Sequence, residues 1–268
     1  MSTTTVEVLV PPPGLADPAD PFRYGWRYVQ HDSGDGNITV EQVPLTLEDI
    51  LHPEEGDQVT HSDAHQRRRR YLCNIFEARL IHDSQAVVLD DVRVKWDLPE
   101  LKPHGPDIMV VLGVRERKNW STFDVALEGV RPAVIVEITS PETRALDLSV
   151  KLDEYDLAGV PLYIIVDTVQ RRGQEVLRLL GYRQTDTAYE VLPPDDQGRL
   201  YLEPLRLSLG VSAGELVCYD EAGTALEDYP AVVAARAAAE ARASEAEARL
   251  RTIEAELARL RGEPAPEA

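Results

Sequence analysis

The sequence predicts an α/β domain built around a mixed β-sheet, followed by a long C-terminal helix. Three observations predict this class. Apolar runs rich in Val, Ile and Leu alternate with segments in which apolar residues recur at helical spacing. Between residues 133 and 167 a strand, a capped helix and a second strand follow one another, which is typical of a parallel crossover. Near Ala231 the composition changes abruptly to Ala, Arg and Glu.

The same composition places the boundaries. We expect a flexible lead over residues 1–22, which are rich in Pro, Asp and Thr without any period. The α/β domain is expected over 23–228, a C-terminal coiled-coil helix over 229–262 and a disordered tail over 263–268. A chain of 268 residues with 43% hydrophobic residues can bury one substantial core.

Periodicity assigns the elements of the domain. A short helix is expected over residues 45–51. The first long helix is expected over 62–82, because its apolar residues recur at helical spacing and Ser62 or Asp63 can cap its N-terminus. Apolar runs predict the following strands, the last three of them antiparallel: 86–94, 107–113, 133–139, 162–167, 175–183, 189–191 and 200–209. A helix over 145–157, between the third and fourth strands, is expected to end at Gly159.

The C-terminal segment carries a short heptad pattern. Its apolar positions recur at alternating spacings of four and three residues: Ala246, Leu250, Ile253, Leu257 and Leu260. A lone helix of this length is marginal in water. We therefore expect it to pair with a second copy of itself or to pack along the domain.

Charge and composition restrict the function. The 47 acidic and 28 basic residues give a net charge of −19, which repels a polyanion at long range and counts against a general nucleic-acid coat protein. The charge is less decisive for a metal-dependent nuclease, because carboxylates hold divalent ions that then meet the phosphate. Cys73 and Cys218 have no paired spacing, and no segment approaches the ~20 apolar residues that span a bilayer, so a reducing, cytoplasmic location is expected.

Two carboxylates stand in apolar strands. Asp107 opens the predicted strand 107–113, and Glu137 lies inside the strand 133–139. Burying a carboxylate in such a run is costly unless another group compensates its charge. If the two converge from neighbouring strands, they suit a hard divalent cation such as Mg²⁺ or Mn²⁺, which can polarise a phosphoryl oxygen and acidify a water. The competing interpretation is a strand-end cap and an ion pair inside the crossover.

A lysine on the following helix completes the pattern. Asp147, Lys151 and Tyr155 are spaced i, i+4, i+8 and share one helical face, which could look back at the strand ends. An ammonium group there would stabilise the charge of a transition state. Alternatively, Lys151 is a solvated residue paired with Asp147, and Tyr155 belongs to the core or shapes the pocket.

These residues belong to a longer motif. The chain resembles the Uma-type restriction endonuclease family of bacteria, within the PD-(D/E)XK nuclease superfamily. The resemblance rests on the run Val136-Glu-Ile-Thr-Ser-Pro-Glu-Thr-Arg144, then Asp147, Lys151 and Tyr155, then Gly159-Val-Pro-Leu-Tyr-Ile-Ile-Val-Asp167. It is strong over residues 100–168 and looser over 45–100, where His65 matches the family's histidine.

The resemblance implies a restriction-endonuclease-like fold and a catalytic centre. By the family's motif, Asp107 and Glu137 are metal ligands, and the reaction is hydrolysis of a DNA phosphodiester by a metal-activated water. The superfamily places its lysine two residues after the glutamate, where this sequence has Thr139, so Lys151 is expected to take that role. A homodimer is expected with this function, because cutting both strands of a duplex needs two sites.

Further candidates are open to two interpretations. Glu77 could add a metal ligand or be a solvated helix residue. His61 and His65 share an i, i+4 face, yet no third ligand lies beside them in sequence, so zinc is not expected, while His65 could line the cleft. The basic run Arg67–Arg70 could contact a phosphate backbone or form a solvated helix face.

The predicted function is that of a metal-dependent endonuclease acting on DNA, with no cofactor besides the metal. Its chief rival, which the net charge favours, is a catalytically silent protein of the same fold that serves as an interaction module. A third interpretation is a hydrolase of a small phosphodiester, which an acidic protein repels less than long DNA.

Overall fold

The computed structural model describes residues 20–32, 38–140, 143–171, 174–227 and 229–261. It divides into two compact units, residues 1–226 and 227–268. The predicted tail and all but the last three residues of the predicted lead lie outside the described residues.

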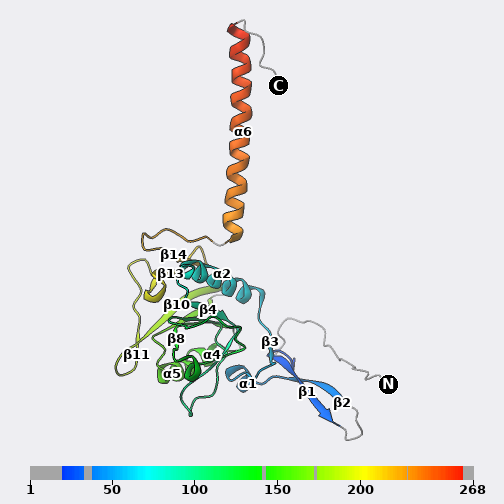
Figure 1. Cartoon of the computed structure of the whole chain (residues 1–268), viewed down its shortest axis with the longest axis vertical. Coiled ribbons are helices and arrows are strands. Elements are labelled where there is room, and N and C mark those ends of the chain that lie inside the picture. The colour runs from blue at the N-terminus through cyan, green and yellow to red at the C-terminus, as the bar shows by residue number, and fades with distance from the viewer. Residues whose placement is uncertain (1–19, 33–37, 141–142, 172–173, 228, 262–268) are drawn as a thin grey trace. The chain divides into compact units, whose positions relative to one another are not determined.

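A six-stranded mixed sheet forms the centre of the first unit (Figure 1). Its order is β11 (Tyr189–Val191), β10 (Gln174–Gln184), β9 (Leu162–Arg171), β8 (Pro132–Ile138), β6 (Ile108–Val111) and β4 (Val87–Asp90). β8 and β9 are parallel, and every other neighbouring pair in this sheet is antiparallel. The predicted mixed α/β class, the parallel crossover and the antiparallel strands that follow it are thereby confirmed.

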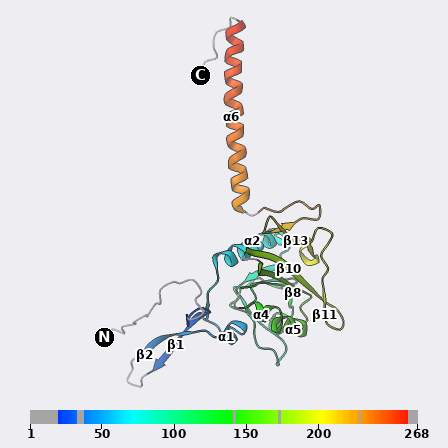
Figure 2. The ribbon, with the colours of Figure 1, turned by 180° about the vertical axis from the view of Figure 1, so that it is seen from behind.

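Both faces of the sheet are covered, as the uniformly buried residues of β6 require. On one face lie α2 (Asp63–Leu80) and a small antiparallel sheet of β12 (Leu200–Leu202), β13 (Leu207–Ser212) and β14 (Glu215–Tyr219). On the other face lie α4 (Arg144–Asp147) and α5 (Val150–Leu157). Figures 1 and 2 show α2 and the pair α4 and α5 on opposite sides of the strands.

Local signals set the helix ends. The Ser62 hydroxyl accepts the His65 N–H at 3.2 Å and caps α2, as predicted. α1 (Leu47–Leu51) begins with a capping box between Thr46 and Asp49. α5 ends where Gly159 adopts a φ of +69°, a conformation in which a side chain would be strained.

Several predicted elements are divided. The strand expected over 86–94 is two strands, β4 and β5 (Arg93–Lys95), separated by Asp91 at a φ of +58°. The strand expected over 200–209 is interrupted by the 3₁₀ turn η1 (Glu203–Leu205), after which Arg206 has a φ of +51°. The single helix expected over 145–157 breaks at Leu148 and Ser149 into α4 and α5. No prediction covered β14, β7 (Thr122–Asp124) or α3 (Val125–Glu128).

An N-terminal sheet was also not predicted. Its order is β2 (Ile38–Pro44), β1 (Gly25–Asp32) and β3 (Gln58–Val59). Arg27 of β1 pairs with Asp49, Glu54 and Asp57, and so ties this sheet to α1 and the loop after it.

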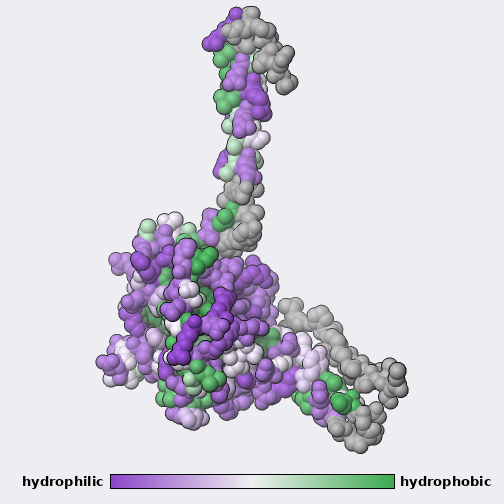
Figure 3. All heavy atoms as spheres, in the orientation of Figure 1, coloured by the Kyte–Doolittle hydropathy of each residue, from purple (hydrophilic) through white to green (hydrophobic). Residues whose placement is uncertain are grey.

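The second unit contains one long helix, α6 (Tyr229–Arg261). Hydrophobic and hydrophilic residues are interspersed along it in Figure 3. Leu250, Ile253 and Leu257 are 58%, 53% and 45% exposed. The helix itself is as predicted, and its pairing as a coiled coil stays a prediction. None of the described helices has the length and apolar character needed to cross a membrane.

Candidate active site

The two carboxylates lie side by side at one end of the neighbouring inner strands β6 and β8. Ile108 pairs with Val136 in antiparallel register, which brings the preceding Asp107 beside Glu137. The Asp107 N–H donates to Glu137 Oε2 at 3.4 Å, and Asp107 Oδ2 accepts the Ile138 N–H at 2.7 Å. Asp107 is 8% exposed and Glu137 is 2% exposed.

The helical face predicted to look back at the strands meets this pair. Lys151 Nζ lies 3.0 Å from Glu137 Oε1 and 2.8 Å from Asp147 Oδ1. The Tyr155 hydroxyl donates to the same Glu137 oxygen at 2.8 Å. All three helical residues are buried. The structure therefore brings Asp107, Glu137, Lys151 and Tyr155 into one cluster, and the solvated position considered for Lys151 is wrong.

An imidazole closes the other side of the cluster. His65 of α2 places Nε2 at 2.9 Å from Asp107 Oδ1. His65 is itself buried, and its Nδ1 has no hydrogen-bond partner among the described residues.

His61 stacks on His65, with ring centroids 4.2 Å apart and ring planes at 11°. A third possible ligand therefore exists, because ligand atoms of His61, His65 and Asp107 all lie within 4.8 Å of one another. An imidazole binds a metal through a lone pair in its ring plane. Two parallel stacked rings cannot both direct that lone pair at one ion, so the observed arrangement offers His65 and Asp107 together but not His61.

Burial and neighbouring charges shift the pKa values of the ionisable groups of the cluster in different directions. Burial raises the pKa of Glu137 to about 8, with repulsion from Asp107 and Asp147 adding to it and Lys151 opposing it. Burial also acts against the charged form of Asp107, but the hydrogen bond and the charge of His65 outweigh it and lower that pKa to about 2. Burial lowers the pKa of Lys151, yet Asp147 and Glu137 raise it above its usual value. Lys151 stays charged because Asp147 pairs with it directly, and Glu137 is the group that takes up a proton.

The donor set fits a divalent cation. Burial raises the pKa of Glu137, and repulsion from Asp107 on the adjacent strand adds to this effect. A dication would compensate both charges. Carboxylate oxygens suit Mg²⁺, and the adjoining His65 nitrogen also suits Mn²⁺ and other transition metals.

Comparison with known proteins identifies the family. A family profile described as "Uma2: Putative restriction endonuclease" matches residues 56–213, which is more than half of the chain. The chain belongs to the Uma2 family. The match includes every residue of the cluster described above, and it confirms the resemblance seen in the sequence. By its family, the protein is grouped with nucleases.

A solved structure is similar to part of this chain. It is described as a putative nuclease belonging to DUF820 from Anabaena variabilis ATCC 29413. The sequences are 14% identical, and the alignment covers 60% of this chain and 91% of the other with a TM-score of 0.42. The search of curated proteins returned no match.

Other predicted site residues of the Uma2 domain lie elsewhere. Thr139, at the position of the superfamily's lysine, donates its hydroxyl to Asp167 Oδ1 at 3.1 Å. Glu77 is exposed on α2, about 18 Å along the helix axis from His65, and lies outside the cluster. The run Arg67–Arg70 is divided, because Arg67 and Arg69 pair with acidic residues and Arg68 turns towards β9.

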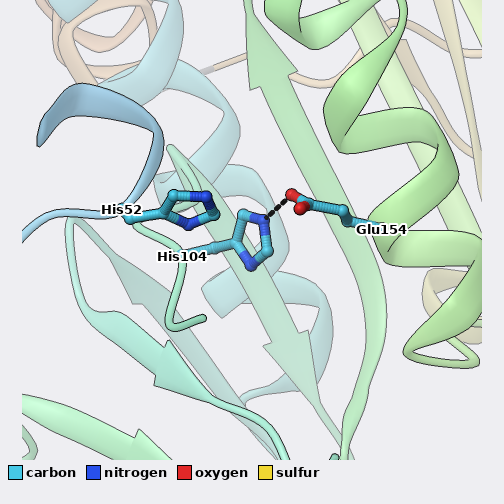
Figure 4. Close-up of side chains that lie close together, drawn as sticks. All are labelled: His52, His104 and Glu154. Atoms are coloured by element: carbon cyan, nitrogen blue, oxygen red, sulfur yellow. Dashed lines mark hydrogen bonds and ion pairs between the residues drawn. The ribbon is translucent and has the colours of Figure 1, made fainter. Parts of the chain in front are cut away.

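A second histidine cluster, which includes His52 just outside the residues matched by the family profile, was not predicted from the sequence. Figure 4 shows His52 from the end of α1, His104 from the segment before β6, and Glu154 from α5, whose ligand atoms lie within 4.8 Å of one another. The Trp96 indole N–H donates to His104 Nδ1 at 2.8 Å. An indole N–H only donates, so neutral His104 carries its proton on Nε2 and donates it to Glu154 at 2.6 Å.

This tautomer leaves His104 without a lone pair directed at a metal. Burial lowers the pKa of His104 despite the bond to Glu154, which favours the neutral ring. The His104 ring packs against Tyr155 with centroids 5.1 Å apart, and so helps to hold the tyrosine whose hydroxyl meets Glu137.

Proposed function

We propose that this Uma2 protein is a metal-dependent endonuclease that hydrolyses phosphodiester bonds of DNA. The observation that carries the proposal is the convergence of Asp107, Glu137 and Lys151 in one buried cluster. The family supports the class of reaction. A cluster of charged groups with strongly perturbed pKa values is also typical of a catalytic centre.

Asp107 and Glu137 would hold Mg²⁺ or Mn²⁺, and His65 Nε2 would become an additional ligand on giving up the proton that it donates to Asp107. When bound, the cation supplies polarisation of a phosphoryl oxygen and acidification of water. Glu137 must give up its proton to bind the cation, because a protonated carboxyl group is a poor ligand. The buried Tyr155 hydroxyl, whose pKa is raised by burial, stays protonated and orients Glu137.

Lys151 would stabilise the charge that develops on the phosphoryl group. Its ammonium lies 3.0 Å from a Glu137 oxygen, so a group held by Glu137 would also be close to it. Asp147 keeps the lysine protonated and fixes its direction. Thr139 has no amine, and its hydroxyl is committed to Asp167, which supports assigning the lysine role to Lys151.

A homodimer fits this function, since a double-strand cut needs two centres. The exposed apolar residues of α6 support pairing of this helix with a second copy.

The function is tested by cleavage of plasmid DNA, single-stranded DNA and a dinucleotide in Mg²⁺, Mn²⁺ or EDTA. We expect the wild type to cut plasmid only with metal, Asp107→Asn to be inactive, and Glu77→Gln, which removes an exposed carboxyl group outside the cluster, to cut like the wild type. Cleavage of the dinucleotide alone would favour a small-phosphodiester hydrolase. Absence of cleavage and of saturable metal binding would favour the silent interaction module.

A further inference from the structure

Another buried carboxylate, Asp167, lies outside the cluster of Asp107, Glu137, Lys151 and Tyr155 and is bound by two arginines. Asp167 of β9 is fully buried. Arg144 donates to it from Nε at 2.7 Å and from Nη2 at 3.0 Å, and Arg178 donates from Nε at 2.5 Å. Burial opposes the charged form of Asp167, but these bonds outweigh it and lower its pKa.

The two guanidinium groups exceed what one carboxylate needs. A single arginine neutralises Asp167, so the second leaves an excess positive charge. Among the described residues, Asp167 is the one carboxylate partner of either arginine. Each guanidinium has five N–H donors, and the bonds to Asp167 use two of Arg144 and one of Arg178. The side chains are 35% and 46% exposed, so the remaining donors can reach a ligand.

The arginines lie at the same end of the sheet as the carboxylate cluster. Glu137 pairs with Ile165, and Asp167 lies two residues further along β9, on the same face of the sheet. Thr139, two residues after Glu137, bonds directly to Asp167. Arg178 stands opposite Asp167 on the next strand, β10, and neighbouring strands are about 4.8 Å apart.

A third arginine approaches this end from the α2 side. Arg68 donates from Nη1 to the Thr168 hydroxyl at 3.1 Å. It lies one helical turn after His65, which contacts Asp107. α2 therefore places an imidazole at the carboxylate cluster and a guanidinium at Thr168 of β9.

We infer that Arg68, Arg144 and Arg178 form a row that binds backbone phosphates of the nucleic acid beside the bond to be cut; the inference rests on the proposed function. Guanidinium groups held in fixed directions suit phosphate oxygens, because planar N–H pairs match them. Asp167 aligns two of these groups before the substrate arrives. A local row of positive charge also explains how a chain with a net charge of −19 can approach a polyanion.

The test measures binding of a fluorescein-labelled 20-base-pair DNA duplex by anisotropy in Ca²⁺, at salt concentrations from 50 to 200 mM, with the integrity of the duplex checked on a gel. Arg144→Gln and Arg178→Gln each leave Asp167 with one guanidinium. Each is expected to weaken binding and to lower the slope of log K against log salt by about 0.9, so that the loss of affinity between the two ends of this fourfold salt range is about 3.5-fold smaller than in the wild type. Arg178→Lys keeps the charge and is expected to keep the slope.

Arg206→Gln is the matched control, because Arg206 also pairs with one carboxylate, Glu221 at 2.8 Å, on an exposed surface. Arg68→Gln is a further variant whose only described partner is a hydroxyl, and it covers the case in which either other variant fails to fold. Wild-type slopes in the variants, an equal loss in Arg206→Gln, or no binding of the duplex by the wild type would each overturn the inference.

Parallel cleavage assays separate this inference from the proposed function. If the wild type does not cut with any metal while the arginine variants still lose binding, hydrolysis is wrong and the phosphate row stands. If the wild type cuts and the variants bind and cut equally well, the phosphate row is wrong and hydrolysis stands.

Discussion

Replacing Glu137 by Gln is expected to remove a loss of stability that the metal-free protein suffers as the pH rises. The pKa of Glu137 is raised from 4.5 to about 8 by burial and by the neighbouring carboxylates. The folded chain thus binds this proton more tightly than the unfolded chain does. The stabilisation is complete below pH 4.5 and is lost as the pH rises through about 8.

The magnitude follows from this difference. About 3.5 pH units at about 1.36 kcal/mol each correspond to about 5 kcal/mol over the whole range, of which about 1 kcal/mol is lost between pH 7 and pH 9. The window above pH 7 avoids His61, whose pKa is lowered by burial to about 4 and which acts in the opposite direction below pH 6.5.

Urea unfolding in EDTA at pH 7, 8 and 9 measures the effect. The wild type is expected to lose stability relative to Glu137→Gln as the pH rises, since Gln imitates the protonated carboxyl group. Glu77→Gln serves as control, because its exposed side chain lies outside the cluster. If the free energy of unfolding changed with pH in the same way for the wild type and Glu137→Gln, the raised pKa of Glu137 would be refuted.

Three further outcomes are expected. Lys151→Met should cost about 3 kcal/mol in urea unfolding, because it leaves Asp147 buried without its ammonium, and it should abolish cleavage while Mn²⁺ still binds; unchanged cleavage would remove Lys151 from the mechanism. Tyr155→Phe should lower the unfolding free energy by about 1 kcal/mol through loss of the bond to Glu137, and a neutral result would contradict that bond. Leu250→Glu with Leu257→Glu should convert a dimer to a monomer in sedimentation without changing the thermal midpoint; a wild type that is already monomeric would exclude pairing through α6.

Strong local signals account for the parts of the fold that could be predicted. The runs that became β8 and β9 are apolar on both faces, and Ser62 and Gly159 mark helix ends by hydrogen bonding and by positive φ. The N-terminal sheet lacked such a signal. β1 and β2 contain polar residues and partly exposed apolar residues without a regular alternation. The two strands pair with each other, and Arg27 of β1 is held by acidic residues of α1 and the following loop.

In the candidate site, too, some contacts follow from local sequence signals and others depend on tertiary packing. Helical spacing puts Lys151 and Tyr155 on one face of α5, so their proximity could be predicted, whereas Asp147 belongs to α4 and reaches Lys151 across the break at Leu148 and Ser149. The contact of His65 with Asp107 joins residues 42 positions apart and depends on how α2 packs on the sheet. The arginines around Asp167 likewise depend on the register of β9 and β10, which no spacing in the sequence reveals.

The central claim is that Asp107 and Glu137 bind one cation together. Calorimetric titration of the wild type with Mn²⁺ at pH 8 tests it most directly. We predict one saturable site in the wild type and in Glu77→Gln, and its loss in Glu137→Gln and Asp107→Asn although these variants remain folded. Equal Mn²⁺ binding by all four proteins, or no binding by the wild type, would contradict the claim.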